Sequence, residues 1–330
     1  MTSFDSHSLK KIAVLTSGGD APGMNAALRS VVRSALYSNI EVLGIKSGFS
    51  GLLEKNWQHL DAGSVANIIQ RGGTFLKTGR CMEFLKPEYR SQAALNLKNI
   101  QVDALVCIGG DGSFTGAQAL YNEHKVPVIG IPATIDNDIF GTEYTIGFDT
   151  AVNTAMQSID KIRDTATSHD RLFIVEVMGR NSGFIATEVG LAGGAEDILI
   201  PENPTNLDLT ISQIKKGIER QKRSSILITA EGQKPGRAYD LAEAIRKKSG
   251  FDAKVCVLGH VQRGGAPSAF DRKLASRMGA AAISALLNGK CDSFVGIQND
   301  QMINVKFSDS IGKLKPVKKE LIDLCRVLGR

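Results

Sequence analysis

The chain has 330 residues and a formal net charge of +6, and 42% of its residues are hydrophobic. This length predicts two domains or one large α/β domain, with enough apolar sequence for a sizeable core. Because few aromatic residues accompany the basic ones, the composition disfavours a protein that binds single-stranded nucleic acid. The modest basic excess fits either a site for anionic metabolites or scattered surface lysines.

The cysteines and the hydropathy pattern predict a cytoplasmic protein. The five cysteines are odd in number and form no C-x-x-C pair, and the five histidines are scattered. This pattern favours reduced, partly buried thiols over a disulfide framework or a zinc site. No apolar run is long enough to cross a membrane, and the polar Met1–Lys11 segment lacks the apolar core of a signal peptide. We therefore expect no membrane and no nucleic-acid partner.

The amino-terminal half is expected to alternate strands and helices. The expected strands are Ile12–Thr16, Ile40–Ile45, Ala104–Ile108 and Val126–Ile131, and the expected helices are Ala26–Tyr37, Ser64–Gln70 (short) and Pro87–Asn99. Short apolar runs bounded by glycine and polar residues are typical of buried parallel strands. Phe49–Leu53 is expected to be a loop.

The carboxy-terminal half continues the alternation. The expected strands are Leu172–Val177, Ile198–Ile200, Ser225–Ala230, Lys254–Leu258 and Phe294–Ile297. The expected helices are Thr154–Thr167, a helix that follows Gly183 and ends at about Gly190, Leu209–Lys222, Leu241–Lys248, Arg272–Asn288 and Pro316–Leu328. A strand that feeds a polar or glycine-containing loop recurs throughout. We therefore predict an α/β fold with two similar doubly wound lobes, largely parallel sheets and the active site in the cleft between them.

Two loops follow neighbouring predicted strands, Gly109–Ser113 (GGDGS) and Thr134–Asp138 (TIDND). Residues just past the carboxyl ends of parallel strands face the ligand crevice, which places Asp111, Asp136 and Asp138 near one site. Glycines let the backbone approach a ligand closely and aim its N–H groups at phosphate. Together these features indicate Mg²⁺-assisted phosphoryl transfer, with one carboxylate free to act as a base. The structural alternative is a pair of turns with capping Asp residues.

The first strand is followed by the glycine-rich loop Ser17–Asn25 and then a helix, which is the pattern of a phosphate-binding βα unit. It is neither a Walker A loop nor a dinucleotide fingerprint. Gly19 is the expected backbone contact to a phosphate, unless it is a plain turn glycine. Arg29 and Arg33 are four residues apart and share a helix face, which indicates an anion site or a solvated surface.

Six motifs occur in the order LTSGGDAPGMNA, GGDGS, TIDND, IGFDTA, EVMGR and LGHVQRGG, over about Lys11 to Met302. By these motifs the chain resembles the bacterial ATP-dependent 6-phosphofructokinase family. The GGDG motif is shared with NAD kinases and lipid kinases, but the other motifs are not. The resemblance implies a glycolytic transferase that moves the γ-phosphoryl of MgATP to the 1-hydroxyl of fructose 6-phosphate, giving fructose 1,6-bisphosphate and ADP. It also implies a homotetramer regulated allosterically by a nucleoside diphosphate or phosphoenolpyruvate.

The resemblance implies a role for each catalytic candidate. Asp136 matches the general base, and Asp111 matches the Mg²⁺ carboxylate. Asp138 matches a second acidic residue that helps the geometry of metal and substrate. Thr134 matches a donor near the transferred phosphate, and Arg180 matches a cation over the developing charge.

The resemblance also implies three sets of binding residues and two lobes. The nucleotide set is Gly19, Arg80, Cys81, Gly110, Asp111, Gly112 and Ser113. The sugar phosphate set is Thr134, Ile135, Asp136, Arg171, Met178, Gly179, Arg180, Glu231, Lys254, His260, Val261, Gln262 and Arg263. The effector set is Arg29, Ser30, Val31, Val32, Arg33, Arg163, Gly194, Ala195, Glu196, Arg220, Lys222, Arg223 and Ser224. Residues 8–146 and 260–310 are expected to bind the nucleotide, and residues 147–259 and 311–330 the sugar phosphate.

The chain departs from the family pattern at several of these sites. Lys254, which with Arg171 would reach in from a neighbouring subunit, stands where the family usually has Arg. Phe49 replaces a usual Tyr near adenine, and Leu85 replaces a usual basic residue. Ala133 stands where ATP users have Gly and pyrophosphate users have Lys.

Because of these departures, we consider alternative donors, acceptors and functions. Gly112 is the small residue of ATP users, where pyrophosphate users carry Asp. ATP is therefore the expected donor and pyrophosphate the alternative. A kinase of another acceptor and an inactive metabolite-binding regulator are further alternatives. Asp111 and Asp136 are both present, which argues against the regulator.

Overall fold

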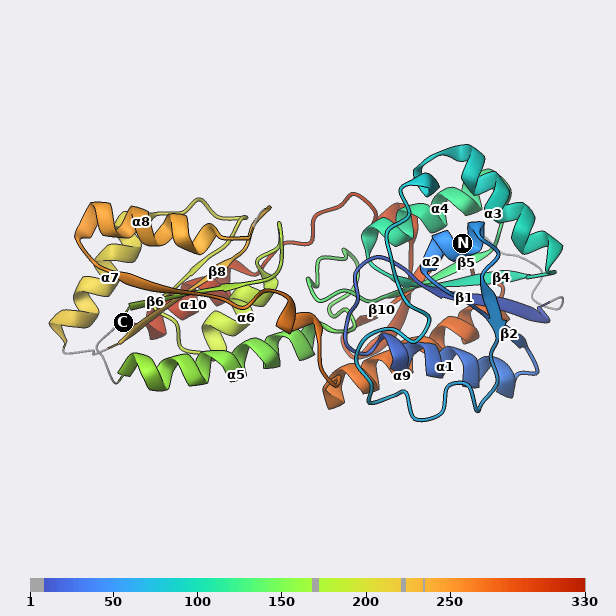
Figure 1. Cartoon of the computed structure of the whole chain (residues 1–330), viewed down its shortest axis with the longest axis horizontal. Coiled ribbons are helices and arrows are strands. Elements are labelled where there is room, and N and C mark those ends of the chain that lie inside the picture. The colour runs from blue at the N-terminus through green and yellow to red at the C-terminus, as the bar shows by residue number, and fades with distance from the viewer. Residues whose placement is uncertain (1–8, 168–171, 221–223, 234, 330) are drawn as a thin grey trace. The chain divides into compact units, whose positions relative to one another are not determined.

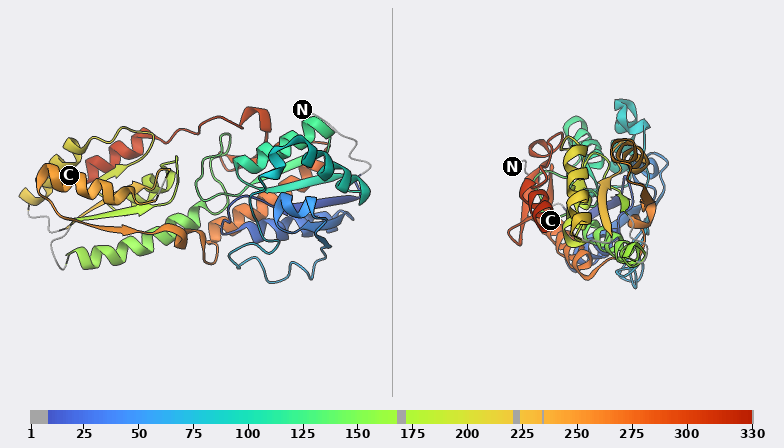
Figure 2. Two further views of the ribbon diagram at one scale, coloured as in Figure 1. Left: turned by 45° about the horizontal axis from the view of Figure 1, so that its top comes forward. Right: turned by 90° about the vertical axis from the view of Figure 1, so that its left-hand side faces the viewer.

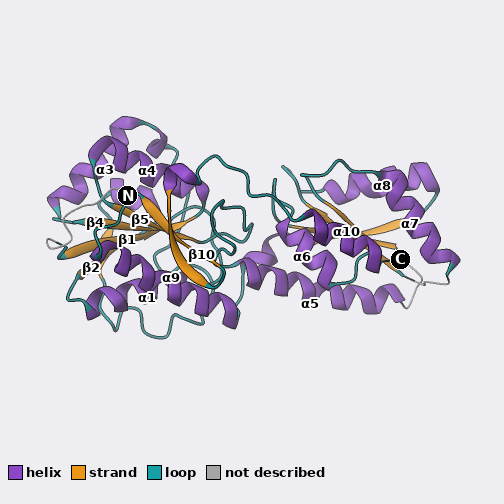
Figure 3. Ribbon diagram, turned by 180° about the vertical axis from the view of Figure 1, so that it is seen from behind, coloured by secondary structure: helices purple, strands orange, loops and turns teal. Residues whose placement is uncertain are grey.

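The computed structural model describes residues 9–167, 172–220, 224–233 and 235–329 (Figure 1). The chain divides into two compact units. Unit 1 comprises Met1–Thr134, Ile139–Asp149 and Arg263–Lys315, and unit 2 comprises Ile135–Asp138, Thr150–Gln262 and Pro316–Arg330. Each unit has a sheet covered by helices, as the view coloured by secondary structure shows (Figure 3).

Unit 1 contains a seven-stranded sheet in the order β11-β10-β5-β4-β1-β2-β3. Its strands are β1 (Lys11–Thr16), β2 (Glu41–Ile45), β3 (Trp57–His59), β4 (Ala104–Gly109), β5 (Val128–Pro132), β10 (Ser293–Gln298) and β11 (Gln301–Lys306). The five inner strands are parallel to one another, and the edge strands β3 and β11 pair antiparallel with β2 and β10. The carboxyl ends of β1, β4 and β5 therefore lie next to one another.

Helices cover both faces of this sheet. They are α1 (Met24–Tyr37), α2 (Gly48–Leu53), α3 (Pro87–Asn99), α4 (Asp111–His124) and α9 (Ala269–Leu287), with the short 3₁₀ helices η2 (Glu83–Leu85) and η4 (Phe307–Asp309). Helices α1 and α9 pack against each other on one face, and α2, α3 and α4 cover the other (Figures 1 and 2).

Unit 2 contains a four-stranded sheet in the order β7-β8-β6-β9, in which all neighbours are parallel. Its strands are β6 (Leu172–Val177), β7 (Asp197–Leu199), β8 (Ser225–Ala230) and β9 (Ala253–Val257). Its helices are α5 (Phe148–Thr167), which begins in unit 1, α6 (Phe184–Ala192), α7 (Leu207–Glu219), α8 (Arg237–Ser249) and α10 (Lys319–Leu328). The 3₁₀ helix η3 (Gly259–Arg263) follows β9. No helix in the described part of either unit combines the length and apolar character needed to cross a membrane.

Most of the predicted elements are confirmed, three of them with the expected bounds: α3, β6 and β8. The α/β class with largely parallel sheets is also confirmed. The two units are less similar to each other than predicted, because one sheet has seven strands and the other has four.

Two local predictions are wrong. Phe49–Leu53 belongs to helix α2, where Phe49 and Leu52 point into the core, and is not a loop. Within this helix Gly51 is required by packing, since a Cβ at this position would lie 1.6 Å from the Lys46 carbonyl oxygen. Ser64–Gln70, all of it described, forms turns instead of a helix. There the Asp61 carboxylate accepts from the backbone N–H of Ser64 at 2.6 Å, as at a helix N-terminus, but Asn67 has a φ of 55° and therefore cannot continue a right-handed helix.

Strand β11 was not predicted. It pairs with β10 through a tight hairpin whose turn residues, Asn299 and Asp300, both have positive φ angles of 49° and 58°. Asn and Asp tolerate this conformation, and it matches the twist of a two-residue hairpin. Half of the β11 residues are polar, so its sequence carries only a weak strand signal, and its pairing depends on the partner strand.

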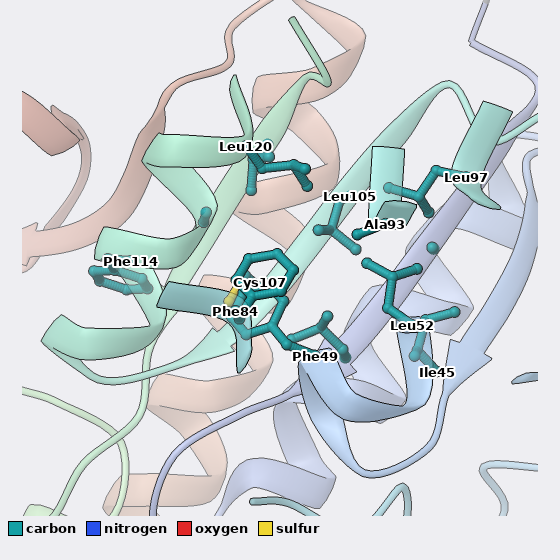
Figure 4. Packing of buried hydrophobic residues seen from close by; sticks show 14 of the residues in the cluster. Ile45, Phe49, Leu52, Phe84, Ala93, Leu97, Leu105, Cys107, Phe114 and Leu120 are labelled. Carbon is teal, nitrogen blue, oxygen red and sulfur yellow. The ribbon is translucent and has the colours of Figure 1, made fainter. Parts of the chain in front are cut away.

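The core of unit 1 lies between its sheet and helices α2 to α4 (Figure 4). Phe114 is fully buried, and its ring lies 5.2 Å from the rings of both Phe294 and Phe307, centroid to centroid. The five cysteines form no disulfide bond, and burial raises the pKa of Cys107 to about 12. Cys107 therefore serves packing.

We predict that Phe114→Ala lowers the free energy of unfolding by about 3–5 kcal/mol, because it leaves a cavity beside two other rings. Denaturant unfolding monitored by circular dichroism measures the loss. Tyr37→Ala is the control, since that side chain is 91% exposed and should change stability by less than about 0.5 kcal/mol. An equal effect of the two substitutions would contradict the assignment of Phe114 to the core.

Candidate active site

The glycine-rich loops of unit 1 meet at the carboxyl ends of three adjacent strands. The backbone N–H of Ser17 donates to the Ile108 carbonyl at 2.9 Å, and the N–H of Ala133 donates to the Gly109 carbonyl at the same distance. These bonds join the loop after β1 to the end of β4, and the end of β4 to the segment after β5. The structure therefore brings together the SGGD loop, the GGDGS loop and Thr134, as the sequence predicted.

The backbones in this region approach one another closely at Gly109. A Cβ at this position would lie 2.7 Å from the Ser17 carbonyl oxygen and 2.6 Å from the Ser113 hydroxyl. Gly112, on the first turn of α4, differs, since an added Cβ meets no described atom within 4 Å outside its own helical turn. Gly109 is therefore required by packing, whereas the space over Gly112 is open to a ligand.

Asp111 is the first residue of α4, and its side chain is exposed. It lies at a helix N-terminus, where backbone N–H groups lack partners within the helix and where anions are stabilised. No group of three or more His, Cys, Asp or Glu among the described residues could hold a metal ion by itself. Mg²⁺ fits this arrangement, because it is usually held by one or two carboxylates together with substrate phosphates and water.

Two predicted arginines lie close to the Gly19 loop within unit 1. The residues just before Arg80 are bonded to this loop: the Thr78 hydroxyl donates to the Gly18 carbonyl at 3.0 Å, and the Gly18 N–H donates to the Gly79 carbonyl at 3.2 Å. The Arg263 guanidinium donates to the Asp20 carbonyl at 3.0 Å. Positive charge is therefore held beside backbone that is free to approach an anion.

In unit 2, Asp136 lies beside the loop that follows β6. The Asp136 side chain is 7% exposed, and its backbone carbonyl accepts from the Ser182 hydroxyl at 3.0 Å. A Cβ at Gly179 would lie 2.3 Å from the Ser182 carbonyl oxygen. Arg180, which is exposed, has a φ of 51°. A non-glycine residue in this conformation is sustained by its surroundings and often marks a functional position.

Other sugar phosphate candidates lie at the same edge of the unit 2 sheet. The Gln262 side chain, fully buried, accepts from the backbone N–H of Met178 at 2.8 Å. Glu231 follows β8 directly and is 7% exposed, and its N–H donates to the Val177 carbonyl at 2.9 Å. His260 and Val261 are exposed on η3. The ends of β6, β8 and β9 thus gather most of this predicted set.

Lys254, on β9, forms an ion pair with a residue that lies just before the same strand. Its ammonium group lies 2.7 Å from the carboxylate of Asp252, and the two side chains are 48% and 69% exposed. An exposed ion pair of this kind contributes little to stability and can exchange partners.

Several parts of the prediction stay untested. Asp111 lies in unit 1 and Asp136 and Asp138 lie in unit 2, with the chain passing between the units at Thr134–Ile135. The convergence of these carboxylates on one crevice remains a prediction. Arg171 lies outside the described residues.

Most described effector candidates of unit 2 lie near the amino end of its sheet. The Arg163 guanidinium donates to the carbonyls of Gly193 and Gly194. Glu196 is buried, and its carboxylate accepts from the backbone N–H of Ile226, at the start of β8. Ala195 is buried, Ser224 is half-buried and Arg220 is exposed, while Lys222 and Arg223 lie outside the described residues.

The effector candidates of unit 1 lie on α1. Arg33 is exposed and Arg29 is half-buried, so either guanidinium can reach a ligand. Ser30, Val31 and Val32 are buried, and their side chains therefore contribute packing and not charge.

The sequence prediction missed residues that act by bonding to the backbone of the candidates. Ser182 bonds Asp136 within unit 2. Thr145 donates to the Thr134 carbonyl at 2.6 Å within unit 1. Ser182 joins segments that are distant in the chain, and both residues lie just outside the motifs EVMGR and IGFDTA, so the sequence did not point to either of them.

Comparison with known proteins identifies the family. A family model described as Phosphofructokinase matches residues 11–286. The chain belongs to the phosphofructokinase family. It is 51% identical to an ATP-dependent 6-phosphofructokinase of Macrococcus caseolyticus, over 97% of this chain and 100% of that protein. It is 52% identical to the ATP-dependent 6-phosphofructokinase of Bacillus pumilus with the same coverage.

Solved phosphofructokinases share the fold. The structure of phosphofructokinase from Saccharomyces cerevisiae matches with a TM-score of 0.85 and 33% identity, over 97% of this chain. This chain spans only 46% of the yeast chain. A pyrophosphate-dependent phosphofructokinase from Marinobacter aquaeolei matches with a TM-score of 0.82 and 24% identity, which supports the fold alone.

We predict opposite effects of alanine at the two glycines of the GGDGS loop. Gly109→Ala should lower stability by about 1–3 kcal/mol, because its methyl group has no room. Gly112→Ala should be neutral or stabilising by up to about 1 kcal/mol, because it lies on a helix with open space above it. Thermal unfolding of both variants measures this, and a destabilised Gly112→Ala would show that the space is not open.

Proposed function

We propose that this protein is a glycolytic, cytoplasmic kinase that transfers the γ-phosphoryl of MgATP to the 1-hydroxyl of fructose 6-phosphate. The observation that carries the proposal is the meeting of the glycine-rich loops after β1 and β4 with the end of β5 in unit 1, with Asp111 at the start of α4. The names of relatives that are about half identical over their whole length support both the donor and the acceptor.

The nucleotide half of the reaction rests on unit 1. Backbone N–H groups of the Gly19 and GGDGS loops would bind phosphate oxygens, and Arg80 would add positive charge. Asp111 would hold Mg²⁺, which when bound neutralises charge on the transferred phosphoryl group. Phosphoryl transfer needs positioning and charge stabilisation more than covalent chemistry, and these residue types provide both.

The acceptor half rests on Asp136. Its carboxylate would take the proton of the sugar 1-hydroxyl while the bond from that oxygen to the γ-phosphorus forms and the bond from phosphorus to the β-bridging oxygen breaks. Arg180 would stabilise charge on the phosphoryl group, and Thr134 would donate to it. Asp138, which is exposed, would help to orient metal and substrate.

The open space over Gly112 supports ATP as the donor. A carboxylate at this position would crowd and repel an α-phosphate, and this chain has none there. Ala133 is 1% exposed and too small to mimic a phosphate or supply a charge. Pyrophosphate is therefore the weaker candidate donor.

Regulation and assembly belong to the same proposal. Arg29, Arg33 and Arg163 are the cations that would bind an anionic effector, such as a nucleoside diphosphate or phosphoenolpyruvate. The site of a sugar phosphate would be completed by Lys254 and Arg171 of a neighbouring subunit in a homotetramer.

We predict that Asp136→Asn lowers kcat by roughly 10³-fold or more, because it removes the base and alters the charge at the transferred group. A coupled assay with ATP and fructose 6-phosphate measures this, and a parallel assay tests pyrophosphate. Asp160→Asn, at an exposed position on α5, is the control and should keep wild-type turnover. Retained turnover in Asp136→Asn would exclude it as the base, and turnover with pyrophosphate alone would reverse the choice of donor.

We predict that Lys254→Arg lowers the KM for fructose 6-phosphate by roughly three- to tenfold, because a guanidinium binds phosphate through two parallel bonds. Initial rates at saturating MgATP measure the KM. Lys247→Arg is the matched control, since Lys247 is also an exposed lysine of unit 2, paired with Glu243 at 2.7 Å. An equal response of both variants would remove Lys254 from the sugar phosphate site.

A further inference from the structure

The segment Arg71–Arg80 of unit 1 carries an exposed arginine at each end. All ten of its residues are described, and none lies in a helix or strand. Its shape therefore depends on bonds to neighbouring elements and not on a regular backbone pattern. Arg80 is a candidate for phosphate binding, so whatever fixes this segment also fixes that charge.

Asn25 makes three of these bonds. Its side-chain N–H₂ group donates to the carbonyls of Arg71 at 3.0 Å and Gly72 at 3.3 Å. Its side-chain carbonyl accepts from the backbone N–H of Phe75 at 2.7 Å. The side chain is only 3% exposed, so water cannot easily replace the protein partners.

The far end of the segment is bonded to the strand and loop that precede α1. The Thr16 hydroxyl donates to the Lys77 carbonyl at 2.7 Å, and Thr78 and Gly79 bond Gly18 as described above. Between the two ends, the Leu76 side chain is fully buried. The segment is thus held at both ends, by Asn25 on one side and by the Gly18 loop on the other.

The Arg71 end also lies against the chain that follows Arg263. A Cβ at Gly72 would lie 2.2 Å from the Gly265 carbonyl oxygen. The carbonyls that Asn25 binds are therefore at a point where two backbones touch. A small displacement there would move Arg71 and the residues after Arg263 together.

We propose that Asn25 is a positioning residue for the phosphate groups of the nucleotide, a role that rests on the function proposed above. Asn25 is the second residue of α1 and lies two residues after Gly23, the last glycine of the loop between β1 and α1. One buried amide therefore joins the loop that would face the phosphates to the segment that carries Arg80. Misplacement of a binding group by about 1 Å can reduce turnover by roughly 10²-fold.

Asn96 offers a matched control within unit 1. It is also 3% exposed, and its side-chain N–H₂ group donates to the carbonyls of Leu52 at 2.9 Å and Leu53 at 3.4 Å. It joins α3 to the end of α2, away from the Arg71–Arg80 segment. Asn→Asp at either site replaces the donor with a charged acceptor that faces two carbonyls, so the stability costs should be similar.

The experiment compares Asn25→Asp with Asn96→Asp. We expect both to lower the melting temperature by similar amounts. Only Asn25→Asp should raise the KM for MgATP by about tenfold and lower kcat/KM for MgATP by about 10²-fold. Calorimetric titration with the non-hydrolysable analogue AMP-PNP and Mg²⁺ should show weaker binding by a similar factor, and hydrogen exchange should accelerate in residues 71–80.

The outcomes distinguish a failure of the role of Asn25 from a failure of the proposed function. Equal KM values and equal AMP-PNP affinities for the two variants would overturn the role of Asn25. A wild-type protein that does not phosphorylate fructose 6-phosphate would contradict the proposed function. The titration and hydrogen-exchange measurements would still test the positioning role of Asn25. Should Asn25→Asp fail to fold, Asn25→Ala removes the same bonds without adding charge. Failure of both, with the Asn96 variants folded, would assign Asn25 to the folding core and contradict the proposal.

Discussion

The contact between backbones at the ends of β1, β4 and β5 is the constraint on which unit 1 depends. Parallel neighbours lie about 4.8 Å apart, so loops that leave adjacent strand ends have little room unless one of them lacks a side chain. Gly109 provides that room beside the Ser17 carbonyl. The same close approach places Asp111 at the N-terminus of α4. The proposed binding of an anion and of a metal would thus both depend on one packing requirement.

In unit 2, the carboxyl ends and the amino ends of the parallel strands carry different sets of candidate residues. The ends of β6, β8 and β9 carry the candidates for sugar phosphate binding, including Glu231 and Gln262. The opposite edge, near the start of β8, carries Glu196 and the loop that Arg163 binds. A ligand at the second edge could influence the first only through strands and helices common to both, and such coupling requires two states with different affinities.

Much of the fold could be predicted because buried parallel strands are short apolar runs with glycine or polar residues after them. This pattern located β4, β6 and β8 and the loops that follow them. It failed at α2, where Gly51 is required by the Lys46 carbonyl, and at β11, where half of the residues are polar and the strand forms only beside β10. Asn25, Thr78 and Ser182 could not be assigned roles, because a side chain that bonds a distant backbone leaves no periodic signal in the sequence.

Two departures from the family pattern, at positions expected to lie near the nucleotide, have opposite physical settings. Phe49 is 4% exposed and stacks on Phe84 with ring centroids 4.1 Å apart and planes 19° apart. A phenol hydroxyl there would need a partner in an apolar core, so the loss of the hydroxyl suits the packing. Leu85 is 68% exposed, so the loss of a basic side chain there removes a charge without filling any space. Position 49 is therefore set by the core of unit 1, whereas position 85 is free to vary with the ligand, and differences in nucleotide affinity among relatives are expected to follow the second position more than the first.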